Sequence, residues 1–281
     1  RGGASTCGTE VVYRLGVTSA EVVVRELDAA TGRYEERAKF DPNAEGAPPA
    51  EFTDVREQAD TRYRVALAEG VTSWQVVEGL KAVDVLTGEV AEVPAEGTLA
   101  PDSYEVRAGD TRESVLTRMS EAQAVILAAA WQGRAEGLPL KSAEEALILA
   151  SIIEKETGVA DERRQVASVF VNRLNRGMRL QTDPTVIYGV TEGKGVLGRG
   201  LRQSELRGAT PWNTYVIEGL PPTPIANPGR ASIEAAVNPD STDYVFFVAD
   251  GTGGHAFAET LDEHNRNVAR WRQIEAERGN N

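Results

Sequence analysis

The 281-residue sequence predicts an α+β protein in which a small strand-rich unit precedes a larger domain that mixes helices and strands. β-branched residues are frequent near the start, most clearly at Val22-Val23-Val24, which is typical of a strand. Helical periodicity dominates the middle, above all in residues 142–157. Residues 243–249 form a near-continuous apolar run, which indicates a buried strand.

The composition argues against several classes of function. A net charge of −13 is the opposite of the basic footprint of a nucleic-acid-binding protein, and it disfavours electrostatic attachment to anionic lipid. The sequence contains no run of eighteen or more apolar residues, the length that indicates a membrane-spanning helix. The two histidines form no His-Glu-x-x-His pattern, and neither a Gly-x-Ser-x-Gly elbow nor a P-loop is present. We therefore expect no metal and no other cofactor. The single cysteine, Cys7, is expected to be an incidental thiol.

Residues 1–60 are predicted to be a β-rich segment that ends in a linker. Strand-like stretches cover residues 10–15 and 20–27, and a Pro-, Gly- and Ala-rich loop covers residues 41–50. No candidate catalytic group lies here, so we expect a truncation that lacks this segment to keep some activity.

Residues 61–108 are predicted to form a small module of their own. A short alternating strand is followed by Gly70, by Thr72 as a helix N-cap, and by apolar residues at helical spacing. A fainter copy of this strand–glycine–cap pattern occurs at residues 104–111. The pattern resembles the opening of a LysM module, a βααβ unit that binds N-acetylglucosamine polymers. A plain strand–turn–helix unit with Trp74 in its core is the alternative.

Residues 109–281 are predicted to form the catalytic domain, which is organised around one helix. Ser142 and Glu145 form a capping box at its start, and Gly158 is expected to adopt a left-handed conformation after its end. Glu156 lies three, four and seven positions after Ile153, Ile152 and Leu149, so it shares their apolar face.

Desolvation and the negative end of the helix dipole both raise a carboxyl pKa, which favours Glu156 as an acid that later acts as a base. A solvated Glu at a helix end is the alternative. Glu154, beside Ala150 and Ser151, is the second candidate for the acid.

The segments that follow supply a scaffold and polar groups. A helix from Asp161, its N-cap, to Asn175 should pack its apolar stripe on the Leu149/Ile152 face. Asp183 is expected first to cap a short helix that continues to Tyr188, and only second to bind a ligand. His255, on a predicted hairpin, is expected to be structural. Side chains suited to sugar hydroxyl and N-acetyl groups are Gln181, Thr182, Asp183, Tyr188, Asn213, Tyr215 and Asn227.

Residues 149–157 resemble the Leu-Ala-x-Ile-x-x-x-Glu-Ser helix of lysozyme-like lytic transglycosylases, with Glu156-Thr157 in the Glu-Ser position. The wider sequence is similar to the MltG (YceG-like) family of endolytic murein transglycosylases. The similarity is carried, in order, by residues 154–157, 166–174, 179–189, 219–222 and 253–257. Residues 96–104 resemble the family's Glu-Gly-x-Leu-x-Pro-Asp-x-Tyr segment, which makes Glu96 a possible cleft residue.

The resemblance implies a specific activity. Glu156 would be the only acid/base in cleavage of the MurNAc–GlcNAc β-1,4 bond within peptidoglycan strands, and 1,6-anhydroMurNAc would form. The loop at residues 219–229, which includes Asn227, would border the cleft. Two alternatives remain: a hydrolytic muramidase, whose second carboxylate would be Asp161, Glu162 or Asp183, and a non-catalytic LysM-type wall-binding protein.

The resemblance also implies a location and partners. A single membrane-spanning anchor would precede Arg1, so that the chain would be held at the bacterial inner membrane with its catalytic domain on the periplasmic side. Peptidoglycan glycan strands would be the substrate, and peptidoglycan synthases and division proteins the implied protein partners.

Overall fold

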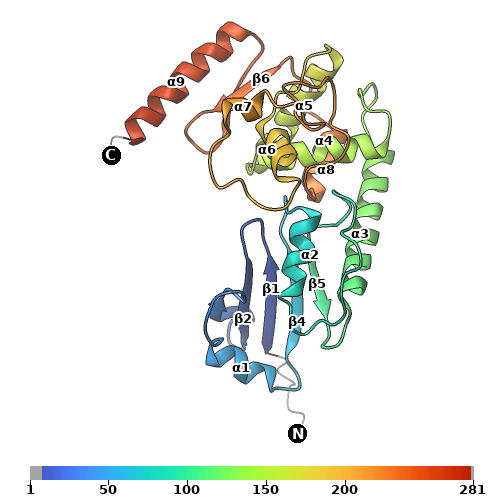
Figure 1. Cartoon of the computed structure of the whole chain (residues 1–281), viewed down its shortest axis with the longest axis vertical. Coiled ribbons are helices and arrows are strands. Elements are labelled where there is room, and N and C mark those ends of the chain that lie inside the picture. The colour runs from blue at the N-terminus through green and yellow to red at the C-terminus, as the bar shows by residue number, and fades with distance from the viewer. Residues whose placement is uncertain (1–7, 280–281) are drawn as a thin grey trace.

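The first half of the chain is organised around a five-stranded sheet in the computed structural model, which describes residues 8–279 (Figure 1). Its strand order is β3-β2-β1-β4-β5. The strands are β1 (Thr9–Leu15), β2 (Ala20–Asp28), β3 (Arg33–Phe40), β4 (Arg62–Leu67) and β5 (Ser103–Val106). β1 pairs in parallel with β4, and the other neighbouring strands pair antiparallel. A parallel pair requires a long connection, and here it contains β2, β3 and helix α1 (Ala50–Arg56).

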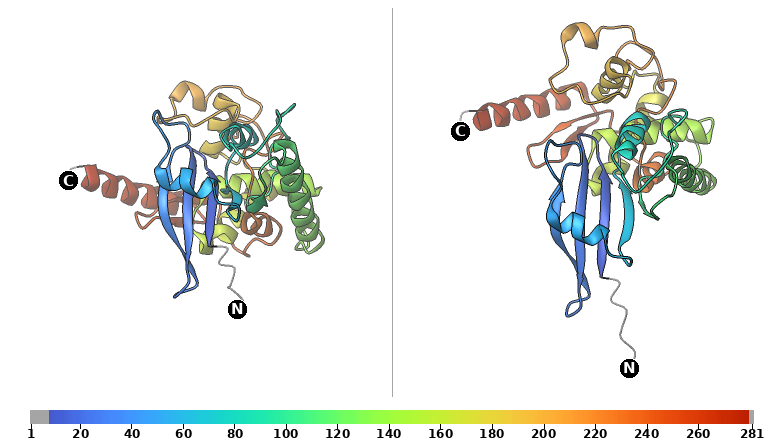
Figure 2. Two further views of the ribbon diagram at one scale, coloured as in Figure 1. Left: turned by 90° about the horizontal axis from the view of Figure 1, so that it is seen from below. Right: turned by 60° about the horizontal axis from the view of Figure 1, so that its bottom comes forward.

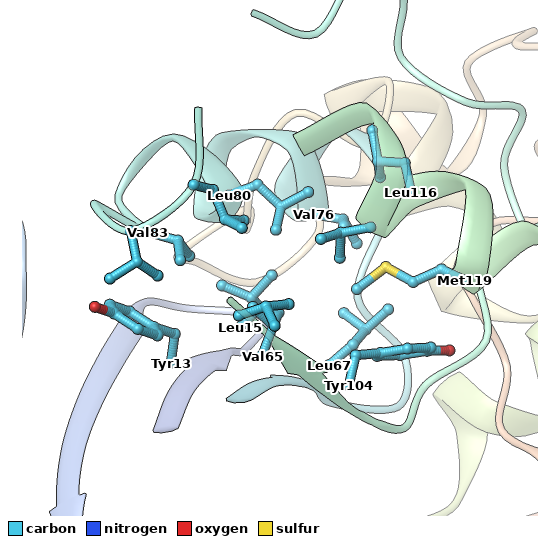
Figure 3. Close-up of a cluster of buried hydrophobic side chains, with 14 of the residues drawn as sticks. Tyr13, Leu15, Val65, Leu67, Val76, Leu80, Val83, Tyr104, Leu116 and Met119 are labelled. Carbon is cyan, nitrogen blue, oxygen red and sulfur yellow. The ribbon is translucent and has the colours of Figure 1, made fainter. Parts of the chain in front are cut away.

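Two helices cover one face of this sheet and close the first hydrophobic core. α2 (Ser73–Lys81) begins at the capping box of Thr72 and Gln75, and α3 (Arg112–Gln132) begins at Thr111. Figure 3 shows their side chains packed over those of the strands. The buried residues labelled there are Tyr13, Leu15, Val65, Leu67, Val76, Leu80, Val83, Tyr104, Leu116 and Met119.

The sheet does not break near residue 60, where the sequence analysis places a domain boundary. β1 lies at the centre of the sheet, between β2 and β4, so residues 1–60 and 61–108 contribute strands to one structure. Among the described residues, α2 is the only helix between β4 and β5, whereas the LysM resemblance implies two. Glycan binding by this unit therefore stays a prediction from sequence.

Deletion of residues 1–60 is now expected to unfold the sheet instead of leaving an active domain. β1 alone buries Val11, Val12, Tyr13 and Leu15, each no more than 4% exposed. Burial of one such side chain contributes about 1.5–3 kcal/mol, so the loss is comparable with the whole stability of a domain. Thermal melting followed by circular dichroism would check this expectation. A truncated chain with an unchanged melting temperature would contradict it.

The second half is a helical layer followed by a hairpin. Its elements are α4 (Ala143–Glu156), a 3-10 turn (Ala160–Glu162), α5 (Arg163–Asn175), α6 (Asp183–Thr191), α7 (Gln203–Leu206), α8 (Arg230–Val237), β6 (Phe246–Ala249), β7 (His255–Ala258) and α9 (Leu261–Gly279). α4 lies at the centre, with Ile152 and Ile153 fully buried against a core that α5 and α8 share. The predicted hairpin is confirmed as the antiparallel pair β6–β7, but the predicted burial of its first strand is wrong, because every residue of β6 is only half-buried.

The ends of the helices differ in detail from the sequence prediction. Ser142 is confirmed as the N-cap of α4, but the Glu145 carboxylate accepts a hydrogen bond from the Lys141 N–H, not from that of Ser142. The predicted left-handed Gly158 is wrong, because α4 ends at an extended Thr157 and Gly158 has no positive φ. Asp161 is not an N-cap either, since it lies in the 3-10 turn before α5.

Asn227 joins the two halves of the molecule. Its fully buried side chain accepts a hydrogen bond from the Leu99 N–H at 2.9 Å and donates one to the Val71 carbonyl at 2.9 Å. Its backbone carbonyl also accepts from the Gly70 N–H at 3.0 Å. These contacts fix the sheet unit against the helical layer.

α9 extends away from the rest of the chain and contacts the β6–β7 hairpin (Figures 1 and 2). None of its described residues is buried. Within residues 8–279, no helix combines the length and the apolar character that crossing a membrane requires.

Candidate active site

Glu156 is the last residue of α4 and lies in a cleft of about 610 Å³. The Thr182 hydroxyl donates a hydrogen bond to its Oε1 atom. Gln181, Asp183 and Tyr215 line the same cleft. The structure thus brings together five of the eight site residues predicted from sequence.

The environment of Glu156 favours its protonated form. Burial raises the pKa of the Glu156 carboxyl, and the nearby charge of Asp183 raises it further. The hydrogen bond from Thr182 lowers this pKa, by less than burial raises it. A carboxyl held neutral in a cleft can donate a proton to a bound substrate.

The raised pKa of Glu156 has a measurable effect on stability. Above a pKa of about 4.3 the carboxyl of Glu156 loses its proton in the unfolded chain, whereas the folded protein keeps this proton up to the raised pKa. The free energy of unfolding should therefore fall as pH rises from the unfolded-state pKa to the folded-state pKa. Glu156→Gln has no titrating proton at this position. Its melting temperature should therefore rise relative to that of the wild type as pH increases through this window. A gap between the two melting temperatures that does not change with pH would contradict this expectation.

A threonine cluster fixes the segment that faces Glu156. The Thr182 N–H donates to the Thr214 hydroxyl at 2.9 Å, and that hydroxyl lies 2.8 Å from the hydroxyl of Thr185. Gln181 has a φ of 52°, a left-handed conformation that costs a non-glycine residue energy and is found where the surroundings enforce it. Since Thr182 is only 2% exposed, the geometry favours a role in positioning Glu156 over contact with a ligand.

Asp183 and Tyr215 form a second polar pair in the cleft. The Tyr215 hydroxyl donates to the Asp183 Oδ1 atom at 2.7 Å. Burial raises the pKa of Tyr215, so the hydroxyl remains a donor. Asp183 occupies the first turn of α6 and Thr182 occupies the N-cap position without a capping side-chain bond, so the predicted capping role of Asp183 is wrong.

Three predicted ligand-binding residues do not line this cleft. The Tyr188 hydroxyl donates to Glu96 Oε2 at 2.9 Å, and its ring packs edge-on against Trp212. The fully buried Asn213 side chain donates to three backbone carbonyls, those of Glu205, Leu206 and Gly208. Asn227 is equally buried at the junction of the two halves. This geometry supports structural roles for the two asparagines, not contacts with a substrate.

The second candidate acid, Glu154, is used by the fold. Its Oε2 atom accepts hydrogen bonds from the Gly229 N–H at 2.9 Å and from the Ser232 hydroxyl at 2.7 Å, at the start of α8. A carboxylate at a helix N-terminus stabilises that helix. Glu154 does not line the cleft, so the geometry favours Glu156 as the acid.

Arg173, Phe246 and His264 are among the cleft-lining residues that the sequence analysis did not predict as site residues. Arg173 is only 8% exposed, and its Nε and Nη1 atoms donate to the carbonyls of Val245 and Arg179. A signal was present, because Arg173 follows Val166, Val169 and Phe170 at helical spacing and places a charge on the apolar face of α5. No group of three or more His, Cys, Asp or Glu side chains in residues 8–279 could hold a metal ion.

A buried carboxyl with a raised pKa in a cleft, with polar side chains around it, is the arrangement expected of an enzyme that works by general acid–base chemistry. The comparison with protein families agrees with this class. The chain belongs to the YceG-like family, which matches residues 26–270.

Named relatives and a solved structure extend this finding. The chain is 38% identical to the endolytic murein transglycosylase of Bacillus subtilis over 173 residues, which are 62% of this chain and 47% of that protein. It is 33% identical to the endolytic murein transglycosylase of Streptococcus pneumoniae over 181 residues, or 62% of this chain and 32% of that protein. The chain therefore spans less than half the length of these relatives. A crystal structure of a yceG-like protein from Listeria monocytogenes superposes with a TM-score of 0.61 at 32% identity, covering 72% of this chain and 75% of that one.

Proposed function

We propose that this chain is an endolytic lytic transglycosylase that cleaves the MurNAc–GlcNAc β-1,4 bond within peptidoglycan strands, with Glu156 as its only acid/base. The observation that carries the proposal is the Glu156 carboxyl, which lies in the cleft, accepts a hydrogen bond from Thr182 and has a pKa raised by burial. Membership of the YceG-like family and the names of the two relatives support the reaction class.

The reaction divides into two proton transfers. Glu156 first protonates the glycosidic oxygen, so the C1–O bond of MurNAc breaks and positive charge develops at C1. The resulting carboxylate then removes the proton from the C6 hydroxyl of the same sugar, whose oxygen bonds to C1 and closes the 1,6-anhydro ring. Glu156 ends protonated, as it began, and no water is consumed.

The other groups of the cleft hold the substrate in place. Gln181 offers an amide, and the Asp183–Tyr215 pair offers a carboxylate and a hydroxyl to sugar hydroxyl and N-acetyl groups. Their contribution is orientation of the reacting atoms, not proton transfer.

A hydrolytic muramidase is the second candidate, because Asp183 shares the cleft with Glu156. A hydrolase needs a second carboxylate, as nucleophile or as base for a water. Glu162, another sequence candidate for this role, instead accepts hydrogen bonds from the backbone N–H of His255 at 2.8 Å and pairs with its ring. The nature of the product ends separates the two reactions.

The product ends should be 1,6-anhydroMurNAc, and Asp183→Asn should not change them. Because Asp183 carries no proton in the proposed reaction, we expect this variant to lose roughly tenfold or less in kcat/KM, an effect of orientation. Mass spectrometry of released muropeptides measures both the rate and the end. Reducing ends from the wild type, or a loss in Asp183→Asn as large as that in Glu156→Gln, would support the hydrolase. Retention on peptidoglycan with no product would indicate a binding protein.

The proposed substrate places the chain where peptidoglycan is made, outside the cytoplasm. Anchoring at the inner membrane by one spanning helix and association with peptidoglycan synthases or division proteins stay predictions from the family resemblance. A pull-down from crosslinked cells with the full-length protein would test the association with these partners.

A further inference from the structure

One face of α9 forms a wall of the Glu156 cleft. Leu261, His264, Asn265 and Val268 line the cleft and follow the i, i+3, i+4, i+7 spacing of a single helical stripe. Leu261 is 58% exposed although it lies on this stripe. Part of the stripe is therefore exposed and not packed against the hairpin.

The ring of His264 is held by an aromatic contact, but its nitrogen atoms make no side-chain hydrogen bonds within residues 8–279. Its ring stacks on Phe246 of β6, with the centroids 4.9 Å apart and the planes 16° from parallel. Its Nδ1 atom is buried and has no hydrogen bond partner within residues 8–279. Burial and the charge of Arg173 lower the pKa of His264, so the imidazole is neutral and offers one N–H donor. An unsatisfied polar atom in such a place is unfavourable unless a ligand or water completes it.

Arg173 brings a buried positive charge to the same place. Its guanidinium carbon lies 5.3 Å from the centroid of the Phe246 ring, on which His264 also stacks. Its N–H groups donate to the carbonyls of Val245, Arg179 and Leu180, but no carboxylate of the described chain forms an ion pair with it. Carbonyl dipoles offset part of the cost of burying a charge and leave its net charge unbalanced.

A purely structural role explains only part of this arrangement. The bonds from Arg173 hold β6 against the segment before Gln181, which any strong donor could do. They do not explain why Arg173, which has no carboxylate partner, and His264, which makes no side-chain hydrogen bond, both line the cleft of Glu156. An anionic group of a bound ligand would balance the charge of Arg173 and accept a hydrogen bond from the Nε2 atom of His264, which, unlike Nδ1, is not buried.

We propose that Arg173, Phe246 and His264 form a subsite for a carboxylate carried by the MurNAc residue of the substrate, a specificity element that rests on the proposed function. In peptidoglycan that carboxylate is either the free lactyl carboxyl of a denuded strand or a carboxylate of the attached peptide. Chitin has neither, so the subsite distinguishes peptidoglycan from an uncharged polymer of the same linkage.

Binding of size-matched oligosaccharides to Glu156→Gln protein tests this subsite, because that variant should not cleave them. Calorimetry would compare a chitin tetramer, a denuded MurNAc–GlcNAc tetramer, the peptide-bearing tetramer, and the peptide-bearing tetramer with its carboxylates amidated. We expect a carboxylate-bearing ligand to bind about tenfold tighter than the chitin and amidated ligands. Tight binding of the denuded tetramer identifies the lactyl carboxyl. Tight binding of the peptide-bearing tetramer alone identifies the peptide.

A second substitution tests whether His264 takes part. His264→Phe keeps an aromatic ring on Phe246 but removes both nitrogens, so the preference for the carboxylate-bearing ligand should shrink severalfold. Arg270→Gln is the control, because it removes a positive charge from an exposed position of α9 outside the stripe, and it should leave the preference unchanged. Equal dissociation constants for charged and uncharged ligands would overturn the subsite. So would a preference that His264→Phe does not alter.

Failure of the subsite and failure of the proposed function give different results. With Glu156 intact, His264→Phe should raise KM for peptidoglycan, leave kcat nearly unchanged, and still release anhydro ends. If the wild type releases anhydro ends without discriminating carboxylates, the subsite alone is wrong. If the wild type releases no anhydro ends, the transglycosylase proposal is wrong. Should His264→Phe fail to fold, the comparison of ligands on the Glu156→Gln protein still decides the matter.

Discussion

Glu156→Gln is expected to reduce turnover by roughly 10²–10⁴-fold, since one side chain carries both proton transfers of the proposed reaction and glutamine can carry neither. The fold should be retained, because glutamine has nearly the same shape and its carbonyl can accept the hydrogen bond that Thr182 donates to Glu156. Release of anhydromuropeptides from purified peptidoglycan gives the rate, and circular dichroism confirms folding.

Glu154→Gln is the matched control for this experiment. It changes the same functional group two residues away on the same helix, but at a carboxylate that binds the start of α8 instead of lining the cleft. We expect it to lower the melting temperature and to retain most of the activity. If instead Glu154→Gln abolished turnover and Glu156→Gln retained the wild-type rate, the acid would have to be reassigned to Glu154.

Asn227→Ala is expected to destabilise the protein by about 2–4 kcal/mol, because the substitution leaves the buried Leu99 N–H without a partner and removes a donor to the Val71 carbonyl. At this chain length such a loss lowers the melting temperature by about 3–7 °C. KM for peptidoglycan, measured below the transition, should be unchanged, since the side chain is fully buried.

Asn175→Ala provides the comparison for this loss. Asn175 is the exposed last residue of α5, and its substitution should change stability by less than about 0.5 kcal/mol. A raised KM in Asn227→Ala with an unchanged melting temperature would contradict the structural role. It would restore the sequence-based assignment of Asn227 to the substrate.

The features that could be predicted from the sequence are local. Helix α4 was recognisable because its N-cap, its apolar spacing and its terminal acid all lie within residues 142–157, and the family resemblance pointed to the same acid. Gln181, Asp183 and Tyr215 were predicted as site residues from side chains suited to a sugar, and the structure places them in the cleft of Glu156. The hairpin β6–β7 followed from its apolar run and its glycines.

The features that could not be predicted depend on contacts between distant segments. The parallel pairing of β1 with β4 leaves no periodic signal, so residues 1–60 looked like a separate segment. The sequence alone cannot distinguish Asn213 and Asn227, whose side chains are buried in the fold, from asparagines that bind a sugar. Only the carbonyls and N–H groups that surround them in the fold show that their hydrogen bonds are already used. No sequence pattern indicates that residues of α9 line the same cleft as Glu156, because the two lie more than a hundred positions apart.

The junction at Asn227 also has a consequence for how the chain folds. Its side chain bonds to Leu99 and Val71, which precede it by 128 and 156 positions. A polypeptide that emerges from the ribosome or a translocon N-terminus first can complete the five-stranded sheet long before residue 227 is available. Contacts that close such long loops form slowly, so docking of the two halves should be the last and slowest step. Until that step is complete, the acid-bearing helix lacks its final support, and the nascent enzyme should be inactive toward the wall.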